Sequence, residues 1–315
     1  MKIRSLALAS LFVVAHAHAH LVREKFNADP AFNGWQSFGV TNLFQWNATN
    51  QVLNVTWDST QPNSYFYHPL GATLTTNDSF CVQFDLQLAD AAITSGYQTE
   101  LAVGLINFSE ATNANYTRTL GTLPDVFEFD YFPADSFGDP ASLDGTLSDS
   151  GANFYFAYDN QELLPGMSYH VVLIHQANSA AISSVIYTNG QVMSVLPNVY
   201  ANYPTTNDFG AFQVDTLSIS SYMDDGYGDD ILAHGTVANI SCAWPLPVGA
   251  VSTPAAGRVQ FTSDTNWLYT LEKSTNFQTW LSAAPATFGN GRNLILSDTN
   301  TPANQTYYRV RADLP

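Results

Sequence analysis

Short runs in which hydrophobic and polar residues alternate fill most of the sequence between residues 26 and 244. A period of two is typical of strands with one buried face, and Gly, Asn, Asp and Pro separate the runs as turns do. The clearest predicted strands are residues 53–57, 64–67, 80–88, 101–108, 126–132, 153–158, 170–175, 181–187, 211–220 and 236–243. So many strands, without a long 3.6-residue period, predict an all-β fold of two stacked antiparallel sheets and exclude a βαβ architecture.

A second, shorter set of strand-like runs follows a change in composition. Residues 245–257 are rich in Pro and small residues, as linkers are. Beyond them, residues 259–262, 267–272, 280–284, 294–296 and 307–311 are strand-like. The sequence therefore predicts a large β-sandwich over residues 20–244 and a small all-β domain over residues 258–315.

The first 19 residues have the parts of a secretory signal peptide. Met1 to Arg4 is basic, residues 6–15 are apolar, and residues 15–17 or 17–19 offer a small-x-small cleavage site. An apolar core of about ten residues is too short for a membrane span of about 20 residues, and no later segment is long enough. We therefore expect an extracellular mature protein without a membrane span.

The mature chain is strongly acidic. Two of the 10 Lys and Arg residues, Lys2 and Arg4, lie in the predicted signal peptide, which leaves 8 against 27 Asp and Glu and a formal charge of −19. Such a surface repels phosphate and no basic cluster offsets it, so the composition excludes nucleic acid as a partner. It attracts divalent cations, although acidity can also serve solubility alone.

One segment joins a predicted strand to a carboxylate-rich turn. Side chains alternate along a strand, so Glu128, Asp130 and Phe132 share one face. Residues 133–140 contain two prolines and a glycine, which turn the backbone and can bring Asp139 back toward the first pair. Oxygen ligands gathered in this way suit calcium. The alternative is a solvated acidic loop that follows a core strand.

The same segment resembles the metal-binding loop of legume lectins, in which Glu-x-Asp-x-aromatic-Pro-Asn is followed by Asp-Pro. The resemblance implies that Glu128, Asp130 and Asp139 are acidic metal ligands and that Phe132 lends a backbone carbonyl. Ala134 replaces the Asn ligand of the lectins, and the His expected after Asp139 is missing. The resemblance therefore implies a single calcium rather than a transition metal.

The large domain as a whole resembles the concanavalin A-like lectin/glucanase superfamily, and the full chain resembles uncharacterised secreted proteins of environmental bacteria. The likeness to that group is carried by residues 34–35, 44–51, 55–59, 62–66, 128–133 and 231–235, and the tail resembles fibronectin type III through residues 268–274, 298–299 and 307–311. The resemblance implies a jelly-roll sandwich followed by a small immunoglobulin-like or fibronectin III-like sandwich. The group itself implies no activity.

A second acidic cluster lies at residues 224–230, where four carboxylates surround two glycines. Close carboxylates repel one another unless a cation or hydrogen-bond donors intervene, and glycine permits the tight backbone of a cation-wrapping loop. The candidate calcium ligands are Asp224, Asp225, Asp229 and Asp230. An exposed polar turn is the alternative, and the spacing is not that of an EF-hand.

The two cysteines, Cys81 and Cys242, lie in predicted strands. In an oxidising compartment they could form a disulfide, which the chain-entropy model values at roughly 5 kcal/mol for a loop of this length. Two buried free thiols are the alternative.

Binding of carbohydrate is expected more than its hydrolysis. Laminarinase-like glucanases of the superfamily carry a second Glu after Glu-x-Asp, and Phe132 and Pro133 stand there instead. Retaining hydrolysis needs two carboxyl groups about 5 Å apart. Binding needs only exposed aromatic and polar groups, and the candidate platforms are Trp35, Trp46, Trp57, Tyr203 and Tyr227, each of which can also be a core residue. The sequence therefore predicts a non-catalytic, lectin-like protein that binds a cell-surface glycan.

A structural role is the alternative function. The small domain has too few predicted strands to close a full sandwich, so a sheet edge can remain open. Residues 21–26 precede the first clear strand and could donate a strand to another copy, which would build a filament. The competing expectation is that this arm completes the sheet of its own chain.

Overall fold

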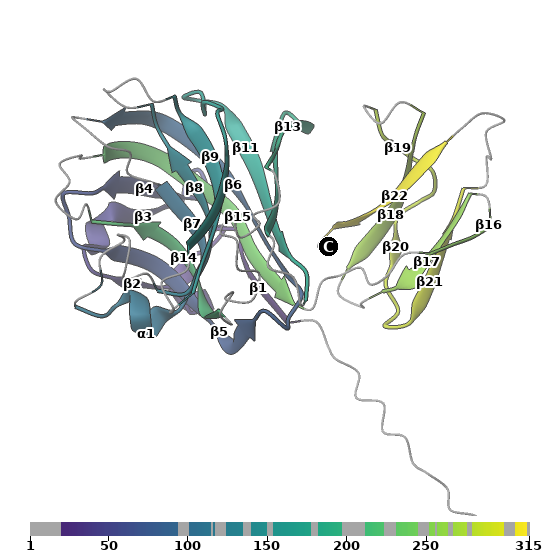
Figure 1. The fold of residues 1–315 in the computed structure, drawn as a ribbon, viewed down its shortest axis with the longest axis horizontal. Coiled ribbons are helices and arrows are strands. Elements are labelled where there is room, and N and C mark those ends of the chain that lie inside the picture. The colour runs from purple at the N-terminus through teal and green to yellow at the C-terminus, as the bar shows by residue number, and fades with distance from the viewer. Residues whose placement is uncertain are drawn as a thin grey trace, which may run out of the picture. The chain divides into compact units, whose positions relative to one another are not determined.

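The computed structural model describes residues 20–93, 101–114, 116, 124–134, 140–149, 154–177, 182–196, 212–223, 231–244, 252–255, 257–263, 267–275, 279–298 and 306–313. Two compact units emerge, one formed by His20–Leu246 and one that contains Pro247–Pro315. Strands dominate both units (Figure 1), which confirms the all-β class. Within the described ranges, no helix has the length and apolarity needed to cross a bilayer.

The large unit consists of two antiparallel sheets. The eight-stranded sheet has the order β13-β12-β11-β6-β15-β4-β3, with β1 also paired to β15. Its strands are β13 (Gln191–Leu196), β12 (Ile182–Thr188), β11 (Ser168–His175), β6 (Phe80–Ile93), β15 (Ile231–Trp244), β4 (Val52–Asp58), β3 (Phe44–Asn47) and β1 (His20–Glu24).

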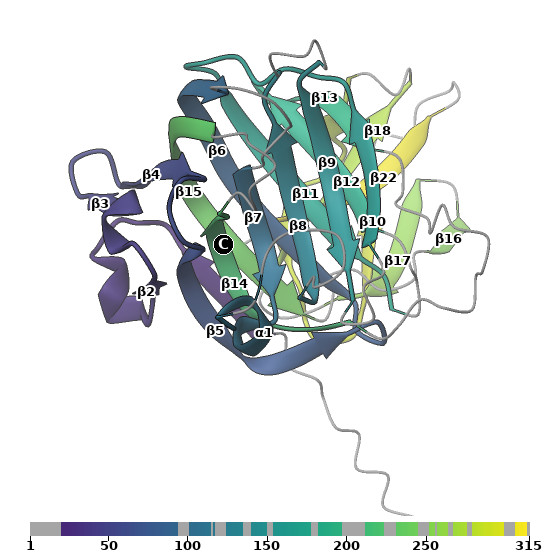
Figure 2. The same cartoon turned by 60° about the vertical axis from the view of Figure 1, so that its left-hand side comes forward.

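The seven-stranded sheet has the order β10-β9-β8-β7-β14-β5-β2. Its strands are β10 (Phe154–Asp159), β9 (Ser142–Ser148), β8 (Val126–Phe132), β7 (Leu101–Ile106), β14 (Gln213–Ser221), β5 (Ser64–Thr75) and β2 (Gln36–Phe38). Figure 2 shows β7, β8 and β9 running side by side in this sheet. The two sheets form the sandwich that the strand pattern predicts.

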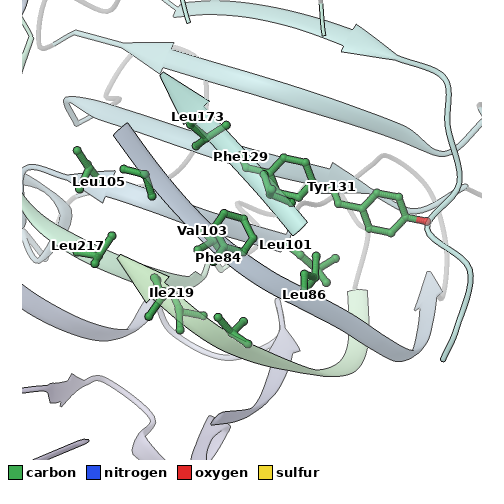
Figure 3. Packing of buried hydrophobic residues seen from close by; sticks show 14 of the residues in the cluster. Phe84, Leu86, Leu101, Val103, Leu105, Phe129, Tyr131, Leu173, Leu217 and Ile219 are labelled. Carbon is green, nitrogen blue, oxygen red and sulfur yellow. The ribbon is translucent and has the colours of Figure 1, made fainter. Parts of the chain in front are cut away.

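The core of the large unit lies between the two sheets. Phe84 on β6 meets Phe129 on β8 with ring centroids 5.8 Å apart, and Leu86, Val103 and Leu217 belong to the same buried cluster (Figure 3). All five side chains are almost completely buried. Each such side chain contributes about 1.5–3 kcal/mol through its removal from water, so the inter-sheet layer stabilises the sandwich.

Three short helical segments connect the strands. The 3-10 helices η1 (Pro30–Asn33) and η2 (Thr41–Leu43) precede β2 and β3, and the α-helix α1 (Phe108–Ala111) follows β7. The side chain of Asn107 caps α1 by accepting a hydrogen bond from the backbone N–H of Glu110. This cap ends β7 at Ile106, two residues before the predicted end of that strand.

The small unit also has two sheets. Strands β16 (Ser252–Ala255), β17 (Arg258–Thr262) and β21 (Asn293–Ser297) form one, and β18 (Leu268–Ser274) pairs with β19 (Leu281–Ser282), β20 (Thr287–Phe288) and β22 (Tyr307–Asp313) in the other. Phe261 on β17 and Tyr269 on β18 bring their ring centroids to 4.9 Å, so the core of this unit lies between its sheets. Its fibronectin III class stays a prediction.

The N-terminal arm belongs to the chain's own sheet. As β1, His20–Glu24 pairs with β15 from Trp244 to Ile240, and His20 stacks on Trp244 at 5.3 Å. Buried Glu24 then fixes the following turn by accepting hydrogen bonds from the Phe26 backbone N–H at 2.6 Å and from Asn33 at 2.8 Å. The arm is therefore the completing strand of the sandwich and not the free donor strand that the filament hypothesis requires.

Cys81 and Cys242 are free thiols, so the disulfide considered from the sequence is not formed. Cys242 lies opposite Val82, and Cys81 lies opposite Ala243, on the adjacent strands β15 and β6. Cys242 and Val82 both point into the inter-sheet core. Successive side chains of a strand point to opposite faces, so Cys81 lies on the other side of the sheet from Cys242.

Candidate functional site

Strand β8 separates its side chains between two environments, as its alternation predicts. Phe127, Phe129 and Tyr131 belong to the core between the sheets. Figure 3 shows Phe129 and Tyr131 in that layer. Glu128 and Asp130 therefore project from the opposite side, the outer face of the seven-stranded sheet, where both are fully buried.

Strand register builds two rows of side chains across this outer face. The first row runs from Thr146 through Glu128, Gly104 and Ser218 to Tyr67. The second runs from Asp144 through Asp130, Ala102, Ser220 and Tyr65 to Phe38. Each row thus has carboxylates on β8 or β9, small residues on β7 and β14, and aromatic residues toward β5 and β2.

Gly104 sets how closely β7 and β8 approach. A Cβ atom at this position would lie 2.3 Å from the carbonyl oxygen of Phe127 and 2.6 Å from the Cα of Glu128. Both contacts are to backbone, which cannot move aside without disturbing the strand pair. Only glycine therefore fits beside Glu128 in the first row.

Glu128 is held by hydroxyl groups from the end of β14. The hydroxyl of Tyr222 donates to Oε1 of Glu128 at 2.6 Å, and that of Ser220 lies 3.5 Å from the same oxygen. Ser218 and Ser220 are themselves linked at 2.9 Å. Because hydrogen bonds to a carboxylate are stronger than neutral ones, these hydroxyls stabilise a side chain that would otherwise be costly to bury.

Asp130 and Asp144 face each other directly across β8 and β9. Both side chains are almost completely buried, and Oδ2 of Asp130 accepts a hydrogen bond of 2.5 Å from the hydroxyl of Thr146. Two like charges at directly opposite positions destabilise a strand pair. Hydrogen-bond donors, a shared proton or a cation can relieve such repulsion, and carboxylate oxygens are ligands that calcium accepts.

Aromatic side chains border the carboxylate rows on the side of β5 and β2. Phe38 stacks on Tyr65 at 5.9 Å and meets Phe108 at 6.0 Å, while Tyr67 lies 4.2 Å from Phe108. Phe38 is 37% exposed, and Tyr67 and Phe108 are half-buried. The backbone N–H of Phe108 donates to Oδ1 of Asp215 at 3.1 Å, which fixes the start of α1 and the position of the Phe108 ring.

Tyr222 links the aromatic border to the carboxylates. Its ring contacts Tyr65 at 6.0 Å and Tyr116 at 6.3 Å, both edge-on, and its hydroxyl reaches Glu128. Tyr65 in turn donates from its hydroxyl to the carbonyl of Ala111 at 2.9 Å. A single connected arrangement therefore joins β5, α1, the end of β14 and β8.

The predicted metal ligands are only partly within the described residues. Glu128, Asp130 and the half-buried Phe132 lie on β8, whereas Asp139, Asp224, Asp225, Asp229 and Asp230 fall outside the described residues. Among the residues that the structure does describe, no group of three or more His, Cys, Asp or Glu is arranged to hold a metal ion. A complete site would therefore need ligands beyond these ranges.

Two of the predicted tryptophan platforms are core residues instead. Trp57 is fully buried, and Trp35 is 3% exposed and stacks on Phe66 at 5.0 Å. Trp46 is 36% exposed, with its Nε1–H donating to the carbonyl of Phe26 at 2.9 Å. Tyr203 and Tyr227 lie outside the described residues.

Several residues of the outer face were not identified as site residues from the sequence. They are Phe38, Tyr65, Tyr67, Phe108, Asp144, Thr146, Ser218, Ser220 and Tyr222. The alternation of Leu217, Ser218, Ile219 and Ser220 is a local signal, because it marks a strand with one apolar and one hydroxyl-bearing face. The sequence gives no comparable sign that this face adjoins β8.

No protein-family profile matches the chain, and no curated protein sequence matches it. Among solved structures, it is similar to a seed lectin of Lotus tetragonolobus, with 10% identity over 72% of this chain and 100% of the lectin at a TM-score of 0.46. Lectin II from Ulex europaeus shows 14% identity over 74% and 100% of the two chains at 0.45. A legume lectin-like domain from Entamoeba histolytica shows 9% over 70% and 95% at 0.42.

Proposed function

We propose that this chain is an extracellular carbohydrate-binding protein without glycosidase activity, and that it binds its ligand at the aromatic border of the seven-stranded sheet. One observation carries the proposal. Phe38, Tyr67 and Phe108 form a partly exposed aromatic surface directly beside two rows of hydrogen-bonded carboxylates and hydroxyls. Sugars present apolar ring faces that stack on aromatic side chains and hydroxyls that bind polar groups, so this combination suits them.

The buried carboxylates position the site and do not touch the sugar. Glu128 and Asp130 are fully buried, so their contribution is to hold Tyr222 and Thr146 in place. Tyr222 then supports Tyr65, on which Phe38 stacks. The expected sugar contacts are the half-exposed rings of Phe38, Tyr67 and Phe108 together with Gln36, which accepts a hydrogen bond from the Tyr67 hydroxyl at 3.1 Å.

Calcium belongs to this proposal as a stabilising ligand. Glu128, Asp130, the backbone carbonyl of Phe132 and Asp139 would hold it, because carboxylate and carbonyl oxygens suit calcium. When bound, the ion would supply charge neutralisation for the buried carboxylates. The acidic cluster of Asp224, Asp225, Asp229 and Asp230 is proposed as a second calcium loop on sequence grounds alone.

Glycoside hydrolysis is a second candidate, favoured by the same opposed pair. Directly opposite residues on antiparallel strands have Cβ atoms about 4.5–5.5 Å apart, so their carboxyl groups can reach the separation of about 5 Å that a retaining pair needs. Asp130 and Asp144 are only 0% and 3% exposed, so a sugar would need a covering segment to move before it could reach them. Binding without hydrolysis is therefore the better-supported role.

A glycan array tests the proposal directly. The purified full chain is applied with calcium and again with a chelator, and bound spots are compared. The proposal predicts a restricted set of bound glycans, weakened by the chelator, and no release of reducing sugar from any bound glycan in solution. An array without a bound glycan under either condition would overturn the binding role, and release of reducing sugar would favour the hydrolase instead.

A further inference from the structure

Charge is divided unequally between the two units. Residues 247–315 contain four acidic residues against five basic ones, a formal charge of +1, and the basic residues are Arg258, Lys273, Arg292, Arg309 and Arg311. Residues 20–246 contain 23 acidic and three basic residues, a formal charge of −20. The small unit therefore holds most of the cationic groups of a strongly acidic mature chain.

No basic cluster was expected from the sequence, but the structure brings two of these arginines together on one face of one strand. Arg309 and Arg311 are separated by one residue on β22, so their side chains share a face and their Cα atoms are about 7 Å apart. Both reach the same carboxylate on β18: Nε of Arg309 and Nη1 of Arg311 each lie 2.7 Å from an oxygen of Glu272. Figure 1 shows β18 and β22 adjacent in the small unit.

Glu272 orients the two guanidinium groups, which remain partly exposed. Its side chain is 5% exposed, whereas those of Arg309 and Arg311 are 41% and 50% exposed. Both guanidinium groups are therefore held in place and still partly open to solvent. Each guanidinium carries five N–H donors in a fixed plane, so a bond to one carboxylate oxygen uses only part of its donor capacity.

An aromatic ring completes this surface. The guanidinium of Arg309 lies over the ring of half-buried Trp280, 4.4 Å from its centroid. Tyr307 lies on the same face of β22, two residues before Arg309. Oriented arginines beside partly exposed aromatic rings match the two features of an acidic sugar, its carboxylate or sulfate and its apolar ring face.

We propose that the face formed by Tyr307, Arg309, Arg311 and Trp280 binds an acidic polysaccharide. This site is independent of the proposed glycan site on the large unit. The arginines would bind carboxylate or sulfate groups on neighbouring sugar units, and Trp280 and Tyr307 would contact the rings. An acidic protein segment would satisfy the arginines equally well, but it would make no use of the aromatic rings.

The test uses the full chain and a matched pair of charge variants. Binding to polygalacturonate, to a sulfated polysaccharide, to polyglutamate and to neutral laminarin is measured by isothermal titration calorimetry. Arg311→Gln removes one guanidinium, while Glu272 keeps Arg309 as a partner. Arg292→Gln is the control, because Arg292 is exposed outside β22 and its replacement changes the charge equally. The fold of each variant is checked by thermal melting.

The proposal predicts that one of the acidic polysaccharides binds and that an excess of laminarin does not displace it. Arg311→Gln should weaken this binding about tenfold, because one charge-assisted hydrogen bond is lost. Arg292→Gln should bind as wild type does, and Phe38→Ala on the large unit should leave this binding unchanged. Equal weakening by Arg292→Gln, equal binding of polyglutamate, or the absence of binding to both acidic polysaccharides would overturn the proposal.

Discussion

The hydroxyl of Tyr222 donates a 2.6 Å hydrogen bond to Oε1 of Glu128, a fully buried carboxylate two strands away in the sheet. This bond gives a hydrogen-bond partner to a buried carboxyl group on the outer face of the seven-stranded sheet. It also fixes the ring of Tyr222 against Tyr65, the residue that supports Phe38. The bond therefore ties the buried polar rows to the aromatic border at which we propose that sugar binds.

Removal of this donor should destabilise the large unit. Tyr222→Phe leaves Glu128 buried with one hydrogen bond fewer, and we expect a loss of about 1–3 kcal/mol in the free energy of unfolding, measured by urea denaturation. Tyr67→Phe is the matched control, because the Tyr67 hydroxyl bonds to Gln36 at an exposed position and its loss should cost much less. Equal effects of the two variants would contradict the role assigned to Tyr222.

The carboxylate of Asp85 should make stability depend on acid pH. Burial raises the pKa of Asp85, but hydrogen bonds from His170 at 2.7 Å and Asn239 at 2.6 Å, together with the charge of His170, outweigh this and lower the pKa below its ordinary value. A carboxylate with a lowered pKa stabilises the fold above its unfolded-state pKa, and this contribution is lost as pH falls through the folded value.

Asp85→Asn should therefore be less stable than wild type near neutral pH, by no more than about 1 kcal/mol because the pair is partly exposed. The difference should shrink as pH falls below about 4. Urea unfolding of both proteins over a series of pH values measures it. A difference that grows as pH falls below about 4 would contradict the assignment.

The cysteines should behave as two unreactive thiols. Loss of hydration raises the pKa of Cys81 to about 12 and that of Cys242 well above its usual range, so little thiolate is present at neutral pH. A thiol-specific reagent should label neither residue in the native protein and both after unfolding. Reductant should leave the melting temperature unchanged. A native protein lighter by two hydrogen atoms than the reduced chain would indicate a disulfide and contradict this account.

Local alternation of apolar and polar residues was sufficient to predict β8, the strand that carries Glu128 and Asp130. The expected strand at residues 126–132 coincides with β8, and the two environments of its side chains follow from a period of two. The neighbours of β8 were not predictable in this way. Tyr222 is 94 residues from Glu128 in the sequence, and only the order of strands in the sheet brings them together.

The tryptophans illustrate a second limit of the sequence. Trp35 and Trp57 are buried because strands from distant parts of the chain cover them, whereas the half-exposed ring of Phe38 lies on a short edge strand with no strong pattern of its own. Exposure is thus a property of the assembled sheets. The cysteines are similar, because their separation onto opposite faces depends on the register between β6 and β15.

The most direct test of the central claim is an equilibrium titration of wild type, Phe38→Ala and Phe32→Ala with a glycan that the array identifies. Phe32 is 86% exposed on η1 and is not a member of either row, so its variant controls for the loss of an exposed ring. Loss of one stacking ring should weaken binding about tenfold in Phe38→Ala, while Phe32→Ala binds as wild type does. Wild-type affinity in a folded Phe38→Ala would contradict the account.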